Sequence, residues 1–552
     1  MKLRKTQTKL AIALGLAAGS MAAIAGASPT IVTVAYTGRA DLWGPNLGAS
    51  AFSDLSGTAF SLTPDGDVIF RGALDGSNTG VWLWNGAGNT ALAKTGDSSP
   101  AGGAFLNSFN QPLRNASGQW TFREGASGSA KIFADHGSGL SLIARGTDPV
   151  PGLPGVTYSS IGTVSPNLSG MGHIAFPISM TGAGVVTSGA TANNSGVVIT
   201  NPSGVASVAL RQNDETGITD VRVGLITGTS LPLVMNDSGR YLALTNLQGA
   251  AVTAGAGAGN DQALFTNRSG SLEMVARRGS PAPGALDGAN YRVISTPAIN
   301  NAGQISFIST LRDGSIPAAT TSLNALFTDA YGPLTMIARG GTPIPASTGF
   351  ASHTWGNSIA DVVLTSSGRM AFRNGGIAGP GITANVNDSV VITTDTAGVM
   401  TTVVQQGTQA VGLAPGINYG SIGSGLRMND VGQVAFTTNL SGPGVFGGPG
   451  GNNSALFATD PDGVLDLIVR RGDQFEAAPG DMRQIESIAL LGSSAGEDGR
   501  SLSFNNTGDL VFALTFTNGS SGIYVAYIPT AGAIGLAGLG TLVLVAQRRR
   551  LA

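Results

Sequence analysis

The sequence predicts an all-β protein made of tandem units. Glycine provides 83 of the 552 residues and only 11% of the residues are charged, a composition that suits short strands and tight turns better than long amphipathic helices. One short pattern recurs eight times, and the two ends of the repeated region look like complementary parts of one unit. Together these observations predict a β-propeller of eight four-stranded blades, with a β-solenoid or a pair of smaller propellers as alternatives.

Each unit contains a turn with a glycine at a fixed place. Three residues before the glycine stands an Asn, Ser or Thr, whose side chain can form a hydrogen bond with the backbone of its own turn. The glycine can supply the positive φ that such a turn often needs. The eight glycines, which are 52 to 76 residues apart, are Gly66, Gly118, Gly172, Gly239, Gly303, Gly368, Gly432 and Gly508.

A strand is expected to follow each turn. The second and fourth residues after the glycine are apolar in every unit, and residues two apart on a strand face the same side. The fourth residue is phenylalanine in seven units, so these rings should pack in a common core: Phe70, Phe122, Phe176, Phe307, Phe372, Phe436 and Phe512. An apolar triplet, a strand ending in Arg/Gln-Gly and a Pro/Gly loop complete about four strands per unit.

The last unit is incomplete at its C-terminal end. It runs through FNNTGDLVFALTF and IYVAYI and then stops after two strands. The segment TIVTVAYTGRADLWGP after residue 29 resembles the missing strand and loop, because residues 34–38 align with residues 275–279. We therefore expect the N-terminal strand to complete the eighth blade, which removes the open sheet edges of the ring.

The repeat also resembles a known family. INNAGQISF, MNDVGQVAF and FNNTGDLVF are similar to the N-x-x-G-x-x-A-F motif of a bacterial tandem-repeat family, and the resemblance covers most of residues 51–527. It implies a secreted or cell-surface location and no particular activity.

Both ends of the chain carry patterns typical of export. Residues 1–27 have a basic start, an apolar stretch and an A-x-A cleavage site, which predicts a signal peptide and leaves residues 28–527 as the propeller. Residues 528–552 combine Pro529 with an apolar run and the basic residues Arg548, Arg549 and Arg550.

This C-terminal arrangement resembles the PEP-CTERM sorting signal, although Thr530 and Ala531 replace the usual Glu-Pro. The resemblance implies a transient membrane anchor and an exosortase-type protease as a partner. A simple membrane tail anchor is the alternative.

Basic residues recur at one position of the repeat. Six units carry them near the end of the expected third strand, at Lys94, Arg145, Arg211, Arg277, Arg339 and Arg470, whereas the other two units have Gln405 and Tyr36. In a closed ring these side chains could bind an anionic polysaccharide through guanidinium forks. The alternative is that each one pairs with a neighbouring Asp or a turn carbonyl and supports its own blade.

The sequence offers little for catalysis. It has no Cys and three His, and it contains no dinucleotide fingerprint, P-loop or nucleophile elbow. DPDGVLD, residues 460–466, resembles the start of a calcium loop but lacks the closing Glu, so we interpret it as a turn and predict no metal and no cofactor. Seven of the 30 basic residues lie in the two end segments, so acidic residues outnumber basic ones in the rest of the chain. This charge argues against nucleic acid as a partner.

We therefore predict an exported, non-catalytic surface or matrix protein that binds polysaccharide or another surface protein. The alternative is a secreted glycan-active hydrolase, because Asp and Glu residues far apart in the sequence could converge in three dimensions.

Overall fold

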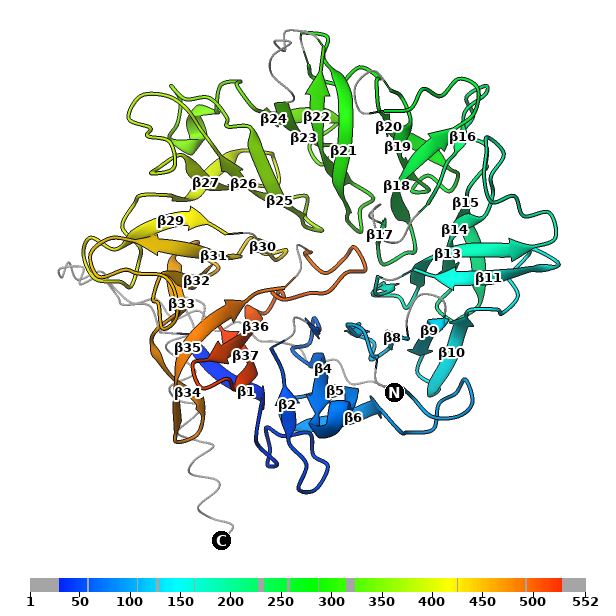
Figure 1. Ribbon diagram of the computed structural model, residues 1–552. Helices are drawn as coiled ribbons and strands as arrows, with labels where there is room; N and C mark the ends of the chain where they lie inside the picture. The colour runs from blue at the N-terminus through cyan, green and yellow to red at the C-terminus, as the bar shows by residue number, and fades with distance from the viewer. Residues whose placement is uncertain are drawn as a thin grey trace, which may run out of the picture.

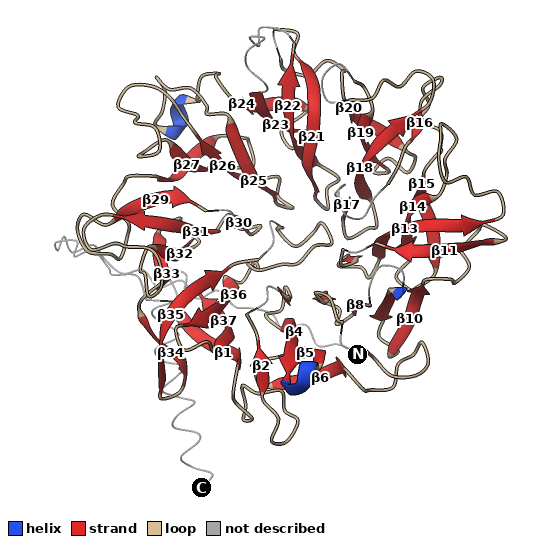
Figure 2. Cartoon of the chain, viewed as in Figure 1, coloured by secondary structure: helices blue, strands red, loops and turns tan. Residues whose placement is uncertain are grey.

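The computed structural model describes residues 29–528, apart from gaps at residues 57–58, 107, 126–128, 163, 227–232, 256–258, 286, 314–322, 424 and 492–493. These residues form eight antiparallel sheets that surround a common centre as the blades of a β-propeller (Figure 1). Strands dominate the described chain, and its short 3₁₀ turns include η1 (Asp75–Ser77) and η3 (Ala346–Thr348) (Figure 2). The predicted all-β class and the eight blades are confirmed.

The first four blades follow one another along the chain, and each blade orders its strands from first to fourth across the sheet. In blades 1, 3 and 4 the first strand is broken into two pieces that both pair with the second strand. Blade 1 comprises β2 (Phe52–Asp54), β3 (Phe60–Leu62), β4 (Val68–Leu74), β5 (Thr79–Trp84) and β6 (Asn89–Lys94). Blade 2 comprises β7 (Leu113–Arg114), β8 (Trp120–Glu124), β9 (Lys131–Asp135) and β10 (Leu140–Arg145). Blade 3 comprises β11 (Val156–Ile161), β12 (Asn167–Leu168), β13 (Ile174–Gly182), β14 (Ser195–Thr200) and β15 (Ala206–Arg211). Blade 4 comprises β16 (Arg222–Val223), β17 (Leu233–Met235), β18 (Tyr241–Gln248), β19 (Gln262–Thr266) and β20 (Glu273–Arg277).

The remaining blades continue around the ring in the same order. Blade 5 comprises β21 (Asn290–Ile299), β22 (Ile305–Arg312), β23 (Leu323–Thr328) and β24 (Thr335–Arg339). Blade 6 comprises β25 (Ser358–Leu364), β26 (Met370–Gly375), β27 (Ser389–Thr394) and β28 (Met400–Gln405). Blade 7 comprises β29 (Asn418–Ile422), β30 (Arg427–Met428), β31 (Val434–Ser441), β32 (Ser454–Thr459) and β33 (Leu465–Arg470). Blade 8 comprises β34 (Gln474–Ala478), β35 (Asp481–Ala489), β36 (Asp509–Phe516), β37 (Ser521–Tyr527) and β1 (Thr30–Tyr36).

Blade 8 is assembled from both ends of the propeller. β1 pairs antiparallel with β37, with Thr30 opposite Tyr527 and Tyr36 opposite Gly522, and so supplies the fourth strand. The chain then passes to blade 1, where the Gly38 N–H donates a hydrogen bond of 2.9 Å to the Phe52 carbonyl. The predicted closure of the ring by the N-terminal strand is therefore confirmed.

The hydrophobic core is divided among the junctions between blades. Each of eight buried clusters combines the phenylalanine-bearing face of one blade with the opposite face of the blade before it. The seven repeat phenylalanines are at most 1% exposed. Phe307, for example, stacks on Phe327 of the neighbouring strand with ring centroids 5.2 Å apart and also packs against blade 4. Burial of this apolar surface is what holds adjacent blades together.

The glycine turns lie between the first and second strands of the blades. All eight glycines have φ between +77° and +98°, a backbone conformation that costs a residue with a side chain. Space is restricted as well, because a Cβ on Gly172 would lie 2.2 Å from Oε1 of Gln119 in the preceding blade. Glycine is therefore needed for the shape of the turn, and at Gly172 a larger residue would also displace the Gln119 side chain.

Candidate functional site at the centre of the ring

The eight turns are joined to one another around the centre. In each of the five turns that begin with asparagine, the side-chain Oδ1 accepts the backbone N–H of the residue four positions later, at 2.8 to 3.0 Å. The Nδ2 of the same residue donates to the carbonyl of the equivalent residue in the next turn, at 2.8 to 3.4 Å. These residues are Asn115, Asn236, Asn300, Asn429 and Asn505. In two of the other turns the hydroxyl oxygens of Thr63 and Ser169 accept the N–H four positions later, at 3.0 and 2.9 Å. Oγ1 of Thr365 instead donates to the carbonyl of Arg369 at 3.1 Å.

The residue that follows in each turn adds a second layer of bonds. The backbone N–H of Asp237 donates to Oδ1 of Asn301 at 2.9 Å, and the N–H of Asp430 donates to Oδ1 of Asn506 at 2.8 Å. Carboxylates take the same role for the N–H groups of Gly170 and Ser366, which donate to Asp237 and Asp430 respectively. Within the described residues, hydrogen bonds of these two kinds link the turns at seven of the eight junctions.

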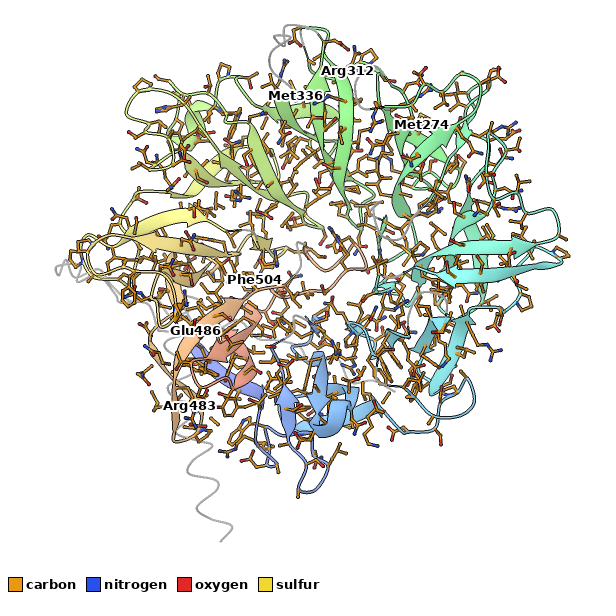
Figure 3. The ribbon with its side chains drawn as sticks, in the orientation of Figure 1. Met274, Arg312, Met336, Arg483, Glu486 and Phe504 are labelled. Carbon is orange, nitrogen blue, oxygen red and sulfur yellow. The ribbon has the colours of Figure 1, made fainter. Side chains whose placement is uncertain are left out.

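A segment of blade 8 fills the centre of this ring of turns. Residues 494–502, which we call the central segment, lie between β35 and β36 and extend across the middle of the ring toward β17 (Figure 1). The carbonyls of Gly499 and Asp498 accept the backbone N–H groups of Leu168 and Met235 at 2.9 and 3.0 Å. The Leu502 carbonyl accepts the N–H of Leu62 at 2.8 Å. The central segment is thus bonded to blades 1, 3 and 4, and Phe504, just beyond it, lies at the inner end of blade 8 (Figure 3).

Glu497 brings a carboxyl group into this centre. Its Oε2 accepts the N–H of Asn301 at 2.8 Å. In other turns the equivalent N–H is bonded by an Asn or Asp side chain of the next turn. The next turn here has the shorter Ser366 at that place, and Glu497 supplies the acceptor. The residue is only 7% exposed. Burial, reinforced by the negative charge of Asp430, raises the pKa of Glu497 to about 8. The carboxyl group is therefore protonated at neutral pH and can donate as well as accept a hydrogen bond.

This carboxyl group should make stability depend on pH. An unfolded Glu497 loses its proton near 4.5, whereas the folded protein retains it up to about pH 8, so the unfolded chain binds fewer protons between these values. Stability should therefore fall as the pH rises through this window, by up to about 1.4 kcal/mol per pH unit. Urea denaturation at pH 5 and pH 7 measures the change. The Glu497→Gln variant, which retains an acceptor for Asn301, should lose about 2 kcal/mol less over this interval than the wild type; equal changes would contradict the assignment.

A cavity of about 270 Å³ lies beside the central segment. It is lined by the inner ends of blades 1 to 4 and by the central segment, and it includes the junction between blades 1 and 2, which is outside the seven that are bridged by turn-to-turn bonds. Arg114, Asn115 and Arg500 contribute donors to its wall, and Asp237 contributes an acceptor. Arg114 is paired with Asp67, and Arg500 is paired with Asp498. The mixture of donors, acceptors and apolar residues suits a polar, uncharged ligand better than a strongly anionic one.

The six basic residues predicted from the repeat lie elsewhere, at the ends of the fourth strands of their blades. The prediction that they end the third strand was wrong, because the strand before the glycine turn in each of these blades is its first strand. The structure does not converge them on one site, and each is bound locally. Nε of Arg211, Arg277 and Arg470 donates to the carbonyls of Asn193, Asn260 and Asn452 at 3.0 to 3.1 Å. The other three pair with carboxylates: Lys94 with Asp97, Arg145 with Asp148, and Arg339 with Asp287. These contacts agree with the alternative prediction, in which each basic residue pairs with a neighbouring Asp or carbonyl of its own blade.

Gln405 shows what this position requires. Its Nε2 donates to the carbonyl of Asn387 at 2.8 Å, the same contact that arginine makes in blades 3, 4 and 7. We therefore expect Arg277→Gln to preserve the contact with Asn260 and to change the free energy of unfolding by no more than about 0.5 kcal/mol. Arg277→Ala should lower stability by about 1 kcal/mol, because the carbonyl loses a donor. Thermal denaturation distinguishes the two variants, and equal losses would show that the hydrogen bond is not what this position provides.

Other sequence predictions concern turns and the ends of the chain. Oδ1 of Asp460 accepts the N–H groups of Asp462 and Val464, both at 2.9 Å, which is the geometry of a turn. The signal peptide and the sorting residues Pro529, Arg548, Arg549 and Arg550 lie outside the described residues. No helix within the described part of residues 29–528 is long and apolar enough to cross a membrane.

Sequence reasoning missed the central segment and the second bond of each asparagine. The signal for the segment was present, because the last spacing between turn glycines is 76 residues and the longest of the series. The second bond carries no local signal, because its acceptor is a backbone carbonyl in another blade.

Several solved structures are similar to the chain. Prolyl oligopeptidase B from Galerina marginata, bound to a 25mer macrocyclization substrate, is 10% identical over 74% of this chain and 49% of its own, with a TM-score of 0.33. Trypanosoma rangeli sialidase is 11% identical over 83% of this chain and 61% of its own, with a TM-score of 0.26. The polysaccharide lyase Uly1 is 9% identical over 86% of this chain and 90% of its own, with a TM-score of 0.30. The chain thus spans about half the length of the prolyl oligopeptidase.

At these identities the likeness concerns the fold alone. No curated protein matches the chain in sequence. A family profile, in contrast, matches residues 62–531, which is most of the propeller. On this match the chain belongs to DUF7453, a family of unknown function.

Proposed function

We propose that the protein is an exported, non-catalytic propeller that binds polysaccharide at the cell surface or in the extracellular matrix. The observation that supports this best is the occupied centre of the ring. The central segment is hydrogen-bonded to blades 1, 3 and 4 through backbone groups, and Glu497 bonds it to blade 5. A closed ring with a filled centre is a rigid scaffold, and rigid scaffolds suit binding because little order is lost when a partner binds.

The carboxyl groups at the centre also favour binding over hydrolysis. A glycoside hydrolase places two carboxyl groups about 5 to 9.5 Å apart, on either side of the bond that it cleaves. Glu497 and Asp430 are instead close enough for the charge of Asp430 to raise the pKa of Glu497, and Oε2 of Glu497 is already occupied by the N–H of Asn301. Oδ1 and Oδ2 of Asp430 are further occupied by Ser366 and Asn506 at 2.8 Å.

The ends of the chain support the location. The basic and apolar pattern of residues 1–27 would direct export, and the C-terminal pattern around Pro529 and Arg548–Arg550 would present the tail to an exosortase-type protease. Fractionation of cells that produce the full chain tests this part. Replacing the three arginines with alanine should retain the protein in a different envelope fraction from the wild type; identical fractionation would contradict the sorting role.

A secreted glycan-active hydrolase is the second candidate. It is favoured by one observation, the raised pKa of Glu497, which is a property that general acids share. Incubation of the full chain with polysaccharides separates the two candidates, because binding retards the protein in affinity electrophoresis whereas hydrolysis also creates new reducing ends. We expect retardation without new reducing ends. Release of reducing ends by the wild type that is lost in Glu497→Gln would replace the proposal with the hydrolase.

A further inference from the structure

A second concave site lies where the ring closes. It is a groove of about 370 Å³ between blades 8 and 1, formed by β1, the loop after it, the end of β5, the β34–β35 hairpin and the end of β37. Its lining includes Leu42, Trp43, Trp84, Glu476 and Tyr527. The volume lies within the range of about 300 to 1,000 Å³ that is common for small-molecule sites.

Aromatic side chains are concentrated in this groove. The whole chain has five tryptophans, and two of them, Trp43 and Trp84, line it together with Tyr527. Tyr527 is 38% exposed and Leu42 is 55% exposed, so part of the apolar lining faces solvent, whereas Trp84 is buried beside them. Large apolar side chains that remain exposed in a concave surface are typical of a binding site.

The loop that carries Trp43 is held in place. The backbone carbonyl of Trp43 accepts the N–H of Tyr36 in β1 at 3.0 Å. The Arg39 guanidinium lies 5.3 Å from the centroid of the Trp43 ring, and Arg39 is in turn paired with Asp41. The indole therefore has a defined position before any ligand binds, which lowers the entropic cost of binding.

One carboxylate supplies the polar side of the groove. Glu476 is the only charged residue among the described residues that line it. Its Oε1 accepts the N–H of Gly480 at 2.8 Å, and this bond fixes the orientation of the carboxylate. A carboxylate has about four acceptor positions, so it can accept further hydrogen bonds from hydroxyl or ammonium groups.

We propose that this groove binds a single neutral or amine-bearing hexose unit of the polysaccharide, an inference that rests on the proposed function. The apolar face of a pyranose ring can pack on aromatic side chains, which provide large contact area at small entropic cost. The Glu476 carboxylate accepts hydrogen bonds from the sugar hydroxyls or pairs with an ammonium group. A uronic acid would bring a second negative charge to Glu476, so the site discriminates against acidic glycans.

Binding of soluble oligosaccharides to the full chain tests this assignment. The probes are a neutral gluco-oligosaccharide, an oligomer of glucosamine and an oligomer of uronic acid, each titrated by calorimetry. Trp43→Ala should weaken binding of the first two probes at least 10-fold, and Leu42→Ser, a change at a more exposed position, should weaken it in the same direction. Phe446→Ala is the control, because Phe446 is an exposed aromatic residue (56%) in the loop between β31 and β32 of blade 7, and its loss should leave binding unchanged.

The charge of Glu476 is tested by a variant of its own. Glu476→Gln should reduce the preference for the glucosamine oligomer and raise the affinity for the uronic acid oligomer. Wild-type protein that binds the uronic acid oligomer most tightly would overturn the assignment, as would Trp43→Ala and Phe446→Ala variants that bind alike. If the wild type is retained by polysaccharide while the groove variants bind normally, the proposed function stands and the groove is not its site. If the wild type binds none of the probes and no polysaccharide, both fail.

Discussion

Deletion of residues 28–38 is expected to abolish the cooperative unfolding of the propeller. The deletion removes β1, in which Val34 and Ala35 are completely buried in the cluster between blades 8 and 1. It also removes Tyr36 from the cluster between blades 7 and 8 and exposes the edge of β37. Two adjacent junctions are therefore weakened at once, in a fold whose net stability is of the order of 5 to 15 kcal/mol. Urea denaturation followed by circular dichroism should show a broad transition in place of a single step.

A circular permutant provides the control for this deletion. Thr30 lies directly opposite Tyr527, so a short turn can join the end of β37 to the start of β1 in a chain that begins at residue 51. This permutant contains every contact of β1 and should unfold cooperatively. A truncated protein that unfolds as cooperatively as the wild type would show that closure by β1 is not required, which is the behaviour of an open solenoid with a frayed end.

The Asn300→Ala variant should lose about 3 kcal/mol of stability, because two buried backbone groups lose their partners. Asn300 is fully buried, its Oδ1 accepts the Gln304 N–H at 2.9 Å, and its Nδ2 donates to the Thr365 carbonyl at 2.8 Å. The first bond holds the turn of blade 5, and the second joins that turn to blade 6. Chemical denaturation of the full propeller measures the loss.

Asn300→Ser separates the two bonds. Ser169 shows that a serine can accept the corresponding N–H within its own turn, since its Oγ accepts the His173 N–H at 2.9 Å. The serine variant should therefore retain the bond within the turn and lose only the bond to blade 6. Its stability should be about 1 to 2 kcal/mol below that of the wild type, and above that of Asn300→Ala. Equal stability of the serine variant and the wild type would contradict a role for the junction bond.

The repeat predicted most of the fold because its constraints are local. A glycine with positive φ, a side chain that accepts a hydrogen bond from its own turn, and a phenylalanine at a fixed place on the next strand each depend on a few neighbouring residues. The split blade was predictable for the same reason, since residues 34–38 resemble the fourth strand of the other units. The number of blades then followed from the number of turns.

The centre of the ring was not predictable in this way. Glu497 reaches Asn301 from 196 positions away, and its environment depends on Asp430 of yet another blade. A repeat pattern says nothing about a segment that occurs once. The basic residues that recur are bound to nearby carbonyls and carboxylates, whereas the groove that we propose as a sugar site, with Trp43 and Trp84, lies at a single junction and so leaves no recurring pattern.

The fate of a polysaccharide that is incubated with the full chain shows most directly whether the propeller binds without catalysis. We expect the protein to bind a neutral or amine-bearing polysaccharide reversibly, and the polysaccharide to be recovered at its original chain length with no new reducing ends. Shortened polysaccharide, or failure of the folded protein to bind any neutral, basic or acidic polysaccharide, would contradict a non-catalytic binding propeller.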